Sequence, residues 1–377
     1  MPIRIAVPHE VTPGECRVAL IPAVADQLTK QDLQVRIQAG AGCAAYYRDS
    51  DYTSAEIVED RTTLLAEADI VLTVNPLPAE DVALLRAGTT VIGFMHPHEF
   101  DDRISALRDH NITSFAMELV PRISRAQNMD ALSSQASIGG YKAALMAANR
   151  TARFFPMLTT AAGTIRPAKV LVIGVGVAGL QAIATARRLG AIVEAYDVRP
   201  ETREQVESLG AKFVDVNVNA VGEGGYAREL TEEEKQRVVD ILAQHVADAD
   251  AIISTAGVPG RPAPKIITTA MVDDMKPGSV IIDLAAYSGG NCELTIPGES
   301  FGHDLVMIYG PLNVPAMMPV HASEMYAKNL MNFMSLIVRD GENNPDWEDE
   351  IVAASVLTRD GKIQHEQTRT RVEGGAA

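Results

Sequence analysis

The sequence is short of basic residues and of cysteine. Its 377 residues carry 33 Lys and Arg against 49 Asp and Glu, which gives a formal net charge of −16. This acidic balance argues against a nucleic-acid partner and against a polybasic membrane-binding surface. The three cysteines, Cys16, Cys43 and Cys292, are odd in number and lack the spacing of metal ligands. We therefore expect a reducing compartment.

Long apolar runs are also missing from the sequence. The longest ones, near residues 330–338 and 280–287, are far shorter than the roughly 18 to 20 residues that span a bilayer. The opening MPIRIAVPHEV reads as a strand, and we expect no secretion signal there. If the protein works at a membrane, we expect another subunit to anchor it.

The most informative stretch that is present runs from Lys169 to Pro200. A β-branched apolar run opens directly into Gly174-x-Gly176-x-x-Gly179, and residues with helical spacing follow until Gly190. A second apolar run, Ile192–Tyr196, ends at Asp197. The pattern predicts a strand, a glycine turn, a helix and a second strand, which together form a βαβ unit.

This unit has the spacing of a dinucleotide site. The three glycines permit a tight turn, close approach of a pyrophosphate and close packing of helix on strand, and the helix N-terminus favours the anion. Asp197 stands where an acid accepts hydrogen bonds from the adenosine ribose, which favours NAD over NADP. Arg199 could instead favour a 2′-phosphate. The expected cofactor-binding residues are Gly174, Val175, Gly176, Val177, Ala178, Gly179, Asp197, Val198, Arg199 and, after the strand 251–254, Thr255, Ala256 and Gly257.

Strand-like and helical segments alternate along the whole chain, which predicts parallel sheets with helical crossovers. The expected strands are 3–7, 34–38, 69–74, 90–94, 112–117, 170–173, 192–196, 251–254 and 279–284. We expect the α/β class, with two Rossmann-like domains separated by a cleft and joined by long helices. One domain takes residues 1–132 and 318–377, and the other, which binds NAD(H), takes 133–317.

The composition of three further segments predicts their structure. A run of good helix formers within residues 129–146 predicts a long connecting helix, with Ser133 or Ser134 as its N-cap. Residues 214–235 hold three glycines and Tyr226, and they form either a solvated insertion or a glycine-hinged lid in which Tyr226 covers the cofactor. The polar tail beyond Asp360 is expected to fray.

Five further motifs stand out along the chain: ECRVAL (15–20), RISRAQNMDALSSQAS (122–137), the glycine fingerprint with DVRPETREQVESLGAKF (197–213), VDDMKPGSVIIDLA (272–285) and ASEMYAKNLMNF (322–333). Together they resemble one family, that of alanine dehydrogenase and nicotinamide nucleotide transhydrogenase, from about Ile3 to Val338. Within it, the chain looks like the NAD(H)-binding component of proton-translocating transhydrogenases, which is domain I, at the start of the alpha subunit.

The alanine dehydrogenase branch is the alternative that this resemblance leaves open. By resemblance, enzymes of that branch use an arginine, a lysine, a histidine and an aspartate to hold the substrate carboxylate and move a proton. Here Arg17 and His96 match, whereas Asn75 and Tyr287 occupy the lysine and aspartate positions. His96, His98 and Glu99 in HPHE resemble metal ligands, but without a distant third ligand we expect no metal site.

For the transhydrogenase branch, the resemblance implies direct hydride transfer from NADH to NADP⁺ that a partner holds. Arg122, Gln127 and Asp130 match the family's catalytic loop, with Gln127 orienting the nicotinamide, and Ser133 matches a cofactor contact. Alternatively, these four residues only cap and salt-bridge the connecting helix. Tyr226 matches the family's mobile-loop tyrosine.

The resemblance also implies partners and a location. The partners would be membrane-spanning subunits that translocate protons, an NADP(H)-binding domain and a second copy of this chain, with no nucleic acid. The reaction would be Re/Si-specific transhydrogenation. The chain would be cytoplasmic and peripheral on the inner (plasma) membrane.

Overall fold

The chain folds into two compact units. The structure, a computed structural model, describes residues 2–216, 230–257 and 260–374. The first unit consists of residues 1–135 and 316–377, and the second of residues 136–315. Tyr226 lies outside the described residues, so the choice between an insertion and a lid stays a prediction.

A parallel sheet with antiparallel additions at one edge forms the first unit. Its described strands follow the order β19-β18-β6-β5-β4-β1-β2-β3, with β1 to β6 mutually parallel. The parallel strands are β1 (Arg4–Val7), β2 (Gln34–Gln38), β3 (Glu56–Val58), β4 (Ile70–Leu72), β5 (Thr90–Gly93) and β6 (Thr113–Ala116). The sheet's helices are α1 (Pro22–Thr29), α2 (Arg61–Ala66), α3 (Ala79–Val82) and α4 (Asp101–Asp109).

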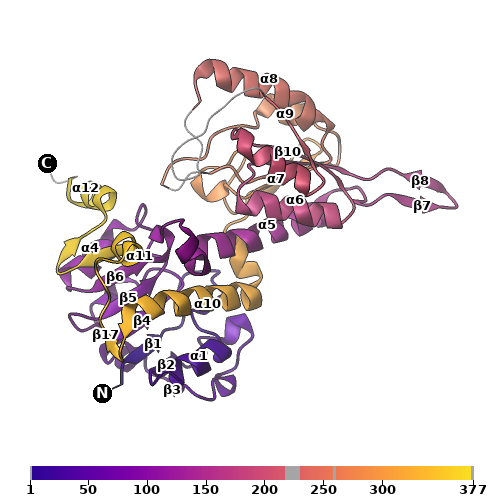
Figure 1. Cartoon of the computed structure of the whole chain (residues 1–377). Helices are drawn as coiled ribbons and strands as arrows, with labels where there is room; N and C mark the ends of the chain where they lie inside the picture. The colour runs from indigo at the N-terminus through magenta and orange to yellow at the C-terminus, as the bar shows by residue number, and fades with distance from the viewer. Residues whose placement is uncertain (1, 217–229, 258–259, 375–377) are drawn as a thin grey trace. The chain divides into compact units, whose positions relative to one another are not determined.

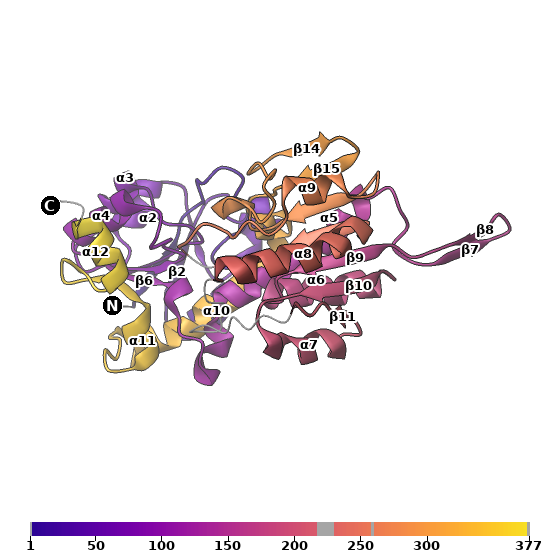
Figure 2. The same ribbon diagram turned by 90° about the horizontal axis from the view of Figure 1, so that it is seen from above.

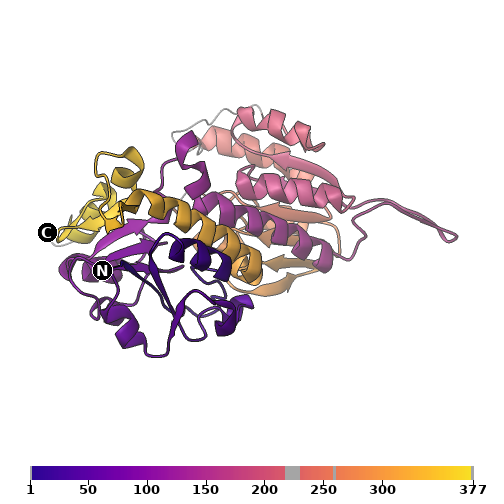
Figure 3. The ribbon, with the colours of Figure 1, turned by 60° about the horizontal axis from the view of Figure 1, so that its bottom comes forward.

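The C-terminal segment completes this unit. Helix α10 (Pro319–Ile337) packs beside α1 in one apolar core, as Figure 3 shows for the orange and indigo helices. A small antiparallel pair, β16 (Val338–Arg339) and β17 (Glu342–Asn343), and helix α11 (Glu350–Ser355) follow. Strands β18 (Val356–Arg359) and β19 (Lys362–Ile363) then join the sheet antiparallel.

The prediction of a frayed tail was wrong. Ile363 is fully buried, and helix α12 (Glu366–Gly374) follows it. Thr368 is also buried, and its hydroxyl donates to the carbonyl of Pro97 at 3.1 Å. A few apolar positions in a polar segment are therefore enough to dock it against the first unit.

The second unit is a parallel sheet covered on both faces. Its described strands follow the order β11-β10-β9-β12-β13-β15-β14, all parallel except β14. They are β9 (Lys169–Ile173), β10 (Ile192–Tyr196), β11 (Lys212–Phe213), β12 (Ala251–Ser254), β13 (Val280–Asp283), β14 (Ser300–His303) and β15 (Val306–Tyr309). Central strands such as AIIS and VIID are buried at every position, as expected of strands with helices on both sides.

Two apolar cores lie on the two faces of this sheet, beneath helices that are labelled in Figure 1. One contains α5 (Ala131–Arg150), α6 (Val177–Arg188) and α7 (Arg203–Ser208), and the other contains α8 (Glu232–Asp248) and α9 (Thr269–Asp273). An exposed hairpin, β7 (Leu158–Thr160) with β8 (Gly163–Ile165), projects from the second unit (Figure 2). The expected α/β class with parallel sheets is confirmed.

Candidate functional site

The glycine turn links β9 to α6 as the sequence predicts. Gly174 has φ +89°, a conformation that glycine adopts readily. A Cβ on Gly179 would lie 1.9 Å from the carbonyl oxygen of Gly174, so only glycine fits there. At Gly176, the N-cap of α6, a Cβ would meet no atom within 4 Å, and no described side chain caps the helix. The first-turn N–H groups can therefore receive an anion.

The turn stands at the point where the strand order reverses. Strand β9 has β10 on one side and β12 on the other, and each is reached by a separate crossover. Dinucleotides bind across the carboxyl ends of strands at such a point. Thr255 follows β12 there, and its hydroxyl donates to the carbonyl of Gly174 at 2.9 Å. Ala256 and Gly257 continue along this edge, so the predicted segment lies beside the glycine turn.

Asp197 is more heavily hydrogen-bonded than its sequence position suggests. Its carboxylate, only 8% exposed, accepts from the backbone N–H of Val175 at 2.7 Å. It also accepts from Arg199, at 2.9 Å from each of the backbone nitrogen, Nε and Nη2. Arg199, which could favour a 2′-phosphate, is therefore paired with Asp197, the acid that disfavours one. The charge that disfavours a 2′-phosphate is partly neutralised.

Sequence reasoning missed Asn291, which fixes the end of β12. Its Oδ1 accepts from the N–H of Ala256 at 3.0 Å, and its Nδ2 donates to the carbonyl of Ala256 at 2.7 Å and to that of Pro264 at 3.0 Å. The two preceding glycines, both with positive φ, were the only local signal of a tight turn after β13.

The polar loop of the first unit comprises the 3₁₀ turn Ser124–Met129 and the start of α5. Ala126 and Met129 anchor the turn in the core, and Gln127 and Arg122 are exposed. The side chain of Gln127 makes no hydrogen bond to another described residue. The Gln127 amide is thus exposed on a turn whose backbone is anchored by the buried side chains of Ala126 and Met129.

The expected N-cap of α5 was wrong. The helix begins at Ala131, and the Asp130 carboxylate accepts from the backbone N–H of Ser133 at 2.9 Å and from its hydroxyl at 2.6 Å. A carboxylate placed three residues earlier thus serves as the cap in place of Ser133. These bonds give Asp130 and Ser133 a capping role at the start of α5.

Arg17 is already paired within the first unit. Its Nη2 donates to Glu15 at 2.7 Å and its Nη1 to Gln135 at 3.0 Å. Burial would raise the pKa of Glu15, but hydrogen bonds and the charge of Arg17 lower it to about 2. Asn75, at the position of the missing lysine, donates to Glu15 and to Glu10. An amino-acid carboxylate would have to displace Glu15 to reach the Arg17 guanidinium.

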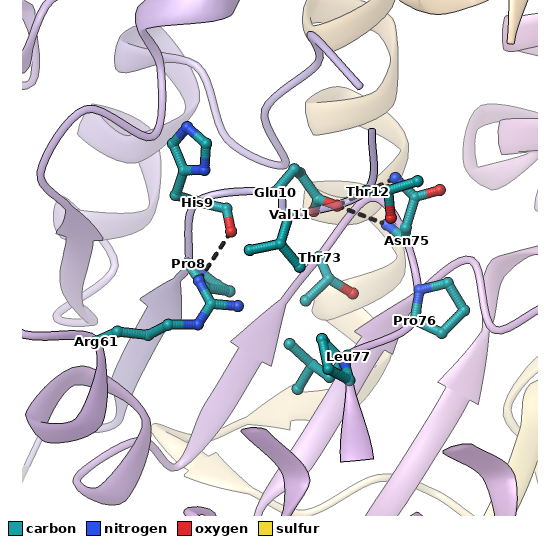
Figure 4. Close-up of a pocket in the computed structure, with 11 residues that line it drawn as sticks. Pro8, His9, Glu10, Val11, Thr12, Arg61, Thr73, Asn75, Pro76 and Leu77 are labelled. Carbon is teal, nitrogen blue, oxygen red and sulfur yellow. Dashed lines mark hydrogen bonds between the residues drawn. The ribbon is translucent and has the colours of Figure 1, made fainter. Parts of the chain in front are cut away.

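A pocket beside this network is shown in Figure 4. Its charged groups are already engaged. Arg61 donates to the carbonyl of His9 at 2.8 Å and pairs with Asp81 at 2.6 Å. Glu10 accepts from the backbone N–H of Val74 at 2.6 Å, and burial raises its pKa to about 7. The pocket offers no evident substrate ligand.

Glu118 provides a test of the first unit's electrostatics. It accepts from the backbone N–H groups of Met95 and His96, and burial raises its pKa to about 7, from 4.5. Between these values the folded chain binds more protons than the unfolded chain, so this group makes stability fall as pH rises. Between pH 5 and pH 8, we expect the free energy of unfolding of the unsubstituted protein to fall by at least about 1 kcal/mol more than that of Glu118→Gln. Urea unfolding at several pH values measures the difference.

The matched control for this test is Glu59→Gln, which alters an exposed glutamate of the same unit. Its pH profile should run parallel to that of the parent. A parallel profile for Glu118→Gln as well would contradict a raised pKa at Glu118.

Within the described part of the chain, one group of metal-ligand side chains comes together: Asp273, His303 and Asp304. His303 Nε2 lies 2.7 Å from Asp273 Oδ1, which makes a partly exposed hydrogen bond. His303 and Asp304 precede β15, so they lie at the sheet edge opposite the glycine turn. His96 and His98 do not belong to this group. We assign no ion to it.

Comparison with known proteins identifies the family. Residues 6–139 match the family described as alanine dehydrogenase/PNT, N-terminal domain, and residues 143–366 match the corresponding C-terminal domain. The chain belongs to the alanine dehydrogenase/PNT family. The resemblance inferred from the sequence motifs is confirmed.

Within the family, the chain is more similar to transhydrogenase subunits than to the alanine dehydrogenases that it also matches. It is 46% identical over 376 residues to the first of the separate parts of NAD(P) transhydrogenase subunit alpha in Rhodospirillum rubrum, covering 96% of this chain and 98% of that protein. The crystal structure of transhydrogenase from Sinorhizobium meliloti is 40% identical, with a TM-score of 0.85 over 97% of this chain and 99% of that one. Alanine dehydrogenase of Halomonas elongata is 28% identical over 96% of this chain and 95% of its own length.

As for membrane segments, no helix among the described residues has both the length and the apolar character needed to cross a bilayer.

Proposed function

We propose that this chain is the NAD(H)-binding subunit of a proton-translocating transhydrogenase. In this role it passes hydride directly from NADH to NADP⁺ held by a partner. The main support for this proposal is the 46% identity over nearly the full length of the Rhodospirillum rubrum transhydrogenase subunit. The family and these relatives support an oxidoreductase role in NAD(P) transhydrogenation.

The residues of the second unit fit a dinucleotide. The N–H groups at the start of α6 would hold the pyrophosphate, because Gly176 places no side chain over them. Asp197 would accept hydrogen bonds from the adenosine ribose. Thr255, Ala256 and Gly257 would line the other half of the site, on the β12 side. Val177, Ala178 and Val198 would contribute backbone and apolar contacts around these groups.

Direct hydride transfer between two nicotinamides requires no side chain to donate or accept a proton. The bound nicotinamide supplies the hydride, so the side chains need only position the ring and exclude competing reactions. We assign orientation of the ring to Gln127, assisted by Arg122, and fixing of that loop to Asp130 and Ser133. The exposed Gln127 amide on an anchored turn supports this assignment.

The proposal includes partners. Membrane-spanning subunits would couple hydride transfer to proton movement, and an NADP(H)-binding domain would present the acceptor with Re/Si stereospecificity. We place the chain on the cytoplasmic side of the inner (plasma) membrane, as a homodimer held there by those subunits. The similarity to transhydrogenase alpha subunits supports this assembly.

The competing function is NAD-dependent alanine dehydrogenation, which the retained Arg17 and His96 favour. The test is to follow NADH absorbance with the chain alone plus pyruvate and ammonium, and with the chain plus a purified NADP(H)-binding component and an NADP⁺ analogue. We expect turnover only in the second mixture. Consumption of pyruvate and ammonium by the chain alone would place it on the dehydrogenase branch.

A further inference from the structure

An exposed tyrosine stands at the carboxyl edge of the second unit's sheet. Tyr287 lies in the 3₁₀ turn Ala286–Ser288, four residues after the end of β13, and 62% of its surface is exposed. Its hydroxyl lies 3.5 Å from the place that a Cβ on Gly257 would occupy. The phenol therefore stands over the one residue of the Thr255–Gly257 segment that has no side chain.

The loop that carries Tyr287 is firmly held. Asp283, fully buried at the end of β13, accepts from the N–H groups of Ala285 and Cys292 and from the hydroxyl of Thr295. Asn291 joins the same loop to both backbone groups of Ala256. These bonds hold the backbone of the loop that carries Tyr287 against the backbone at the end of β12, next to Gly257.

The sheet order tells which half of a dinucleotide this edge would meet. The pyrophosphate site is at the end of β9, and the acid for the adenosine ribose follows β10, on one side of it. A dinucleotide that crosses the switch point extends to the other side. That side holds β12 and β13, with Gly257 and Tyr287 at their ends.

From these observations, and resting on the proposed function, we propose that Tyr287 is a positioning residue for the nicotinamide half of NAD(H). Its ring forms a wall of the site above Gly257, and its hydroxyl donates a hydrogen bond to the nicotinamide mononucleotide half. An aromatic ring offers a flat apolar face together with a polar tip, which suits a ligand part with both a heteroaromatic ring and hydroxyl groups.

The experiment compares two ligands. ADP carries the adenosine and pyrophosphate groups alone, and NADH carries the nicotinamide half as well. By calorimetric or fluorescence titration of the full chain, Tyr287→Phe should weaken NADH binding by roughly 2- to 10-fold, the range of one hydrogen bond. Tyr287→Ala should weaken it further, and both variants should bind ADP within about twofold of the parent.

A second pair of variants tests the contact with Gly257. Gly257→Val places a branched side chain in contact with the phenol, since its Cβ would lie 3.5 Å from the Tyr287 hydroxyl, so it should shift the ring and weaken NADH binding in the parent. It should weaken NADH binding less in the Tyr287→Ala background, because two groups in contact give non-additive effects. Tyr46→Ala, which removes a 79% exposed tyrosine of the first unit, is the matched control and should leave both affinities unchanged.

The outcomes separate two failures. A parent chain that binds neither NADH nor ADP would defeat the proposed function itself. A parent that binds both, with Tyr287→Ala binding NADH equally tightly, would overturn the role of Tyr287 alone. Equal losses for ADP and NADH would overturn it too, because the effect would not belong to the nicotinamide half.

Discussion

Replacement of Gln127 by asparagine should slow hydride transfer by about 10- to 100-fold, since displacement of a positioning group by about 1 Å can cost that much. The substitution keeps the amide but shortens its stem by one methylene. The turn beneath it is unaffected, because Ala126 and Met129 anchor it. NADH affinity should change little, as expected when an interaction that matters only in the transition state is lost. Single-turnover absorbance with the NADP(H)-binding component measures the rate, and titration measures the affinity.

The neighbouring Asn128→Ala is the matched control for Gln127→Asn. Asn128 is exposed on the same turn, and its described tertiary bonds, from Asn329 and Asn332, go to its backbone carbonyl. This variant should keep the parental rate. If Gln127→Asn lost as much in NADH binding as in rate, Gln127 would grip the cofactor instead of orienting it.

Replacement of Asp197 by alanine should weaken NADH binding by about 1 to 3 kcal/mol, or roughly 5- to 150-fold. The variant loses the acceptor for the ribose hydroxyls and also the bond that holds the N–H of Val175. It leaves the Arg199 guanidinium without its carboxylate partner, beside the place where a 2′-phosphate would stand. NADPH affinity should therefore rise as NADH affinity falls, and parallel titrations with the two nucleotides measure both changes.

Arg199→Ala provides the opposite case. It keeps the Asp197 carboxylate and its bond to Val175 but removes the neutralising charge, so NADPH should bind more weakly than to the parent. Unaltered NADH affinity in Asp197→Ala would sink the ribose assignment. A fall in the NADPH affinity of Asp197→Ala would show that Arg199 does not bind the 2′-phosphate.

The sequence predicted the parts of the fold that local pattern controls. The predicted strands 34–38, 192–196 and 251–254 coincide with β2, β10 and β12, because each contains buried β-branched residues and is followed within two residues by a polar or glycine residue. The glycine turn was predictable as well. Gly174 and Gly179 must be glycine for reasons of backbone conformation and contact within six residues.

Features that depend on side-chain conformation or on distant partners were not predictable. The pairing of Arg199 with Asp197 depends on side-chain conformation at the end of β10, and the docking of α12 depends on Pro97, which is 271 residues away from Thr368. The start of α5 depended on which of several polar residues became the cap. Gly257 and Tyr287 are also 30 positions apart, and only the pairing of β12 with β13 brings them together.

The most direct test of direct hydride transfer uses NADH that carries deuterium at the transferred C4 position. The chain is mixed with the purified NADP(H)-binding component and NADP⁺ in ordinary water, and the NADPH is analysed by mass spectrometry. We predict that the NADPH retains the deuterium and that none forms without the chain. NADPH that carries solvent hydrogen instead of deuterium would contradict the account.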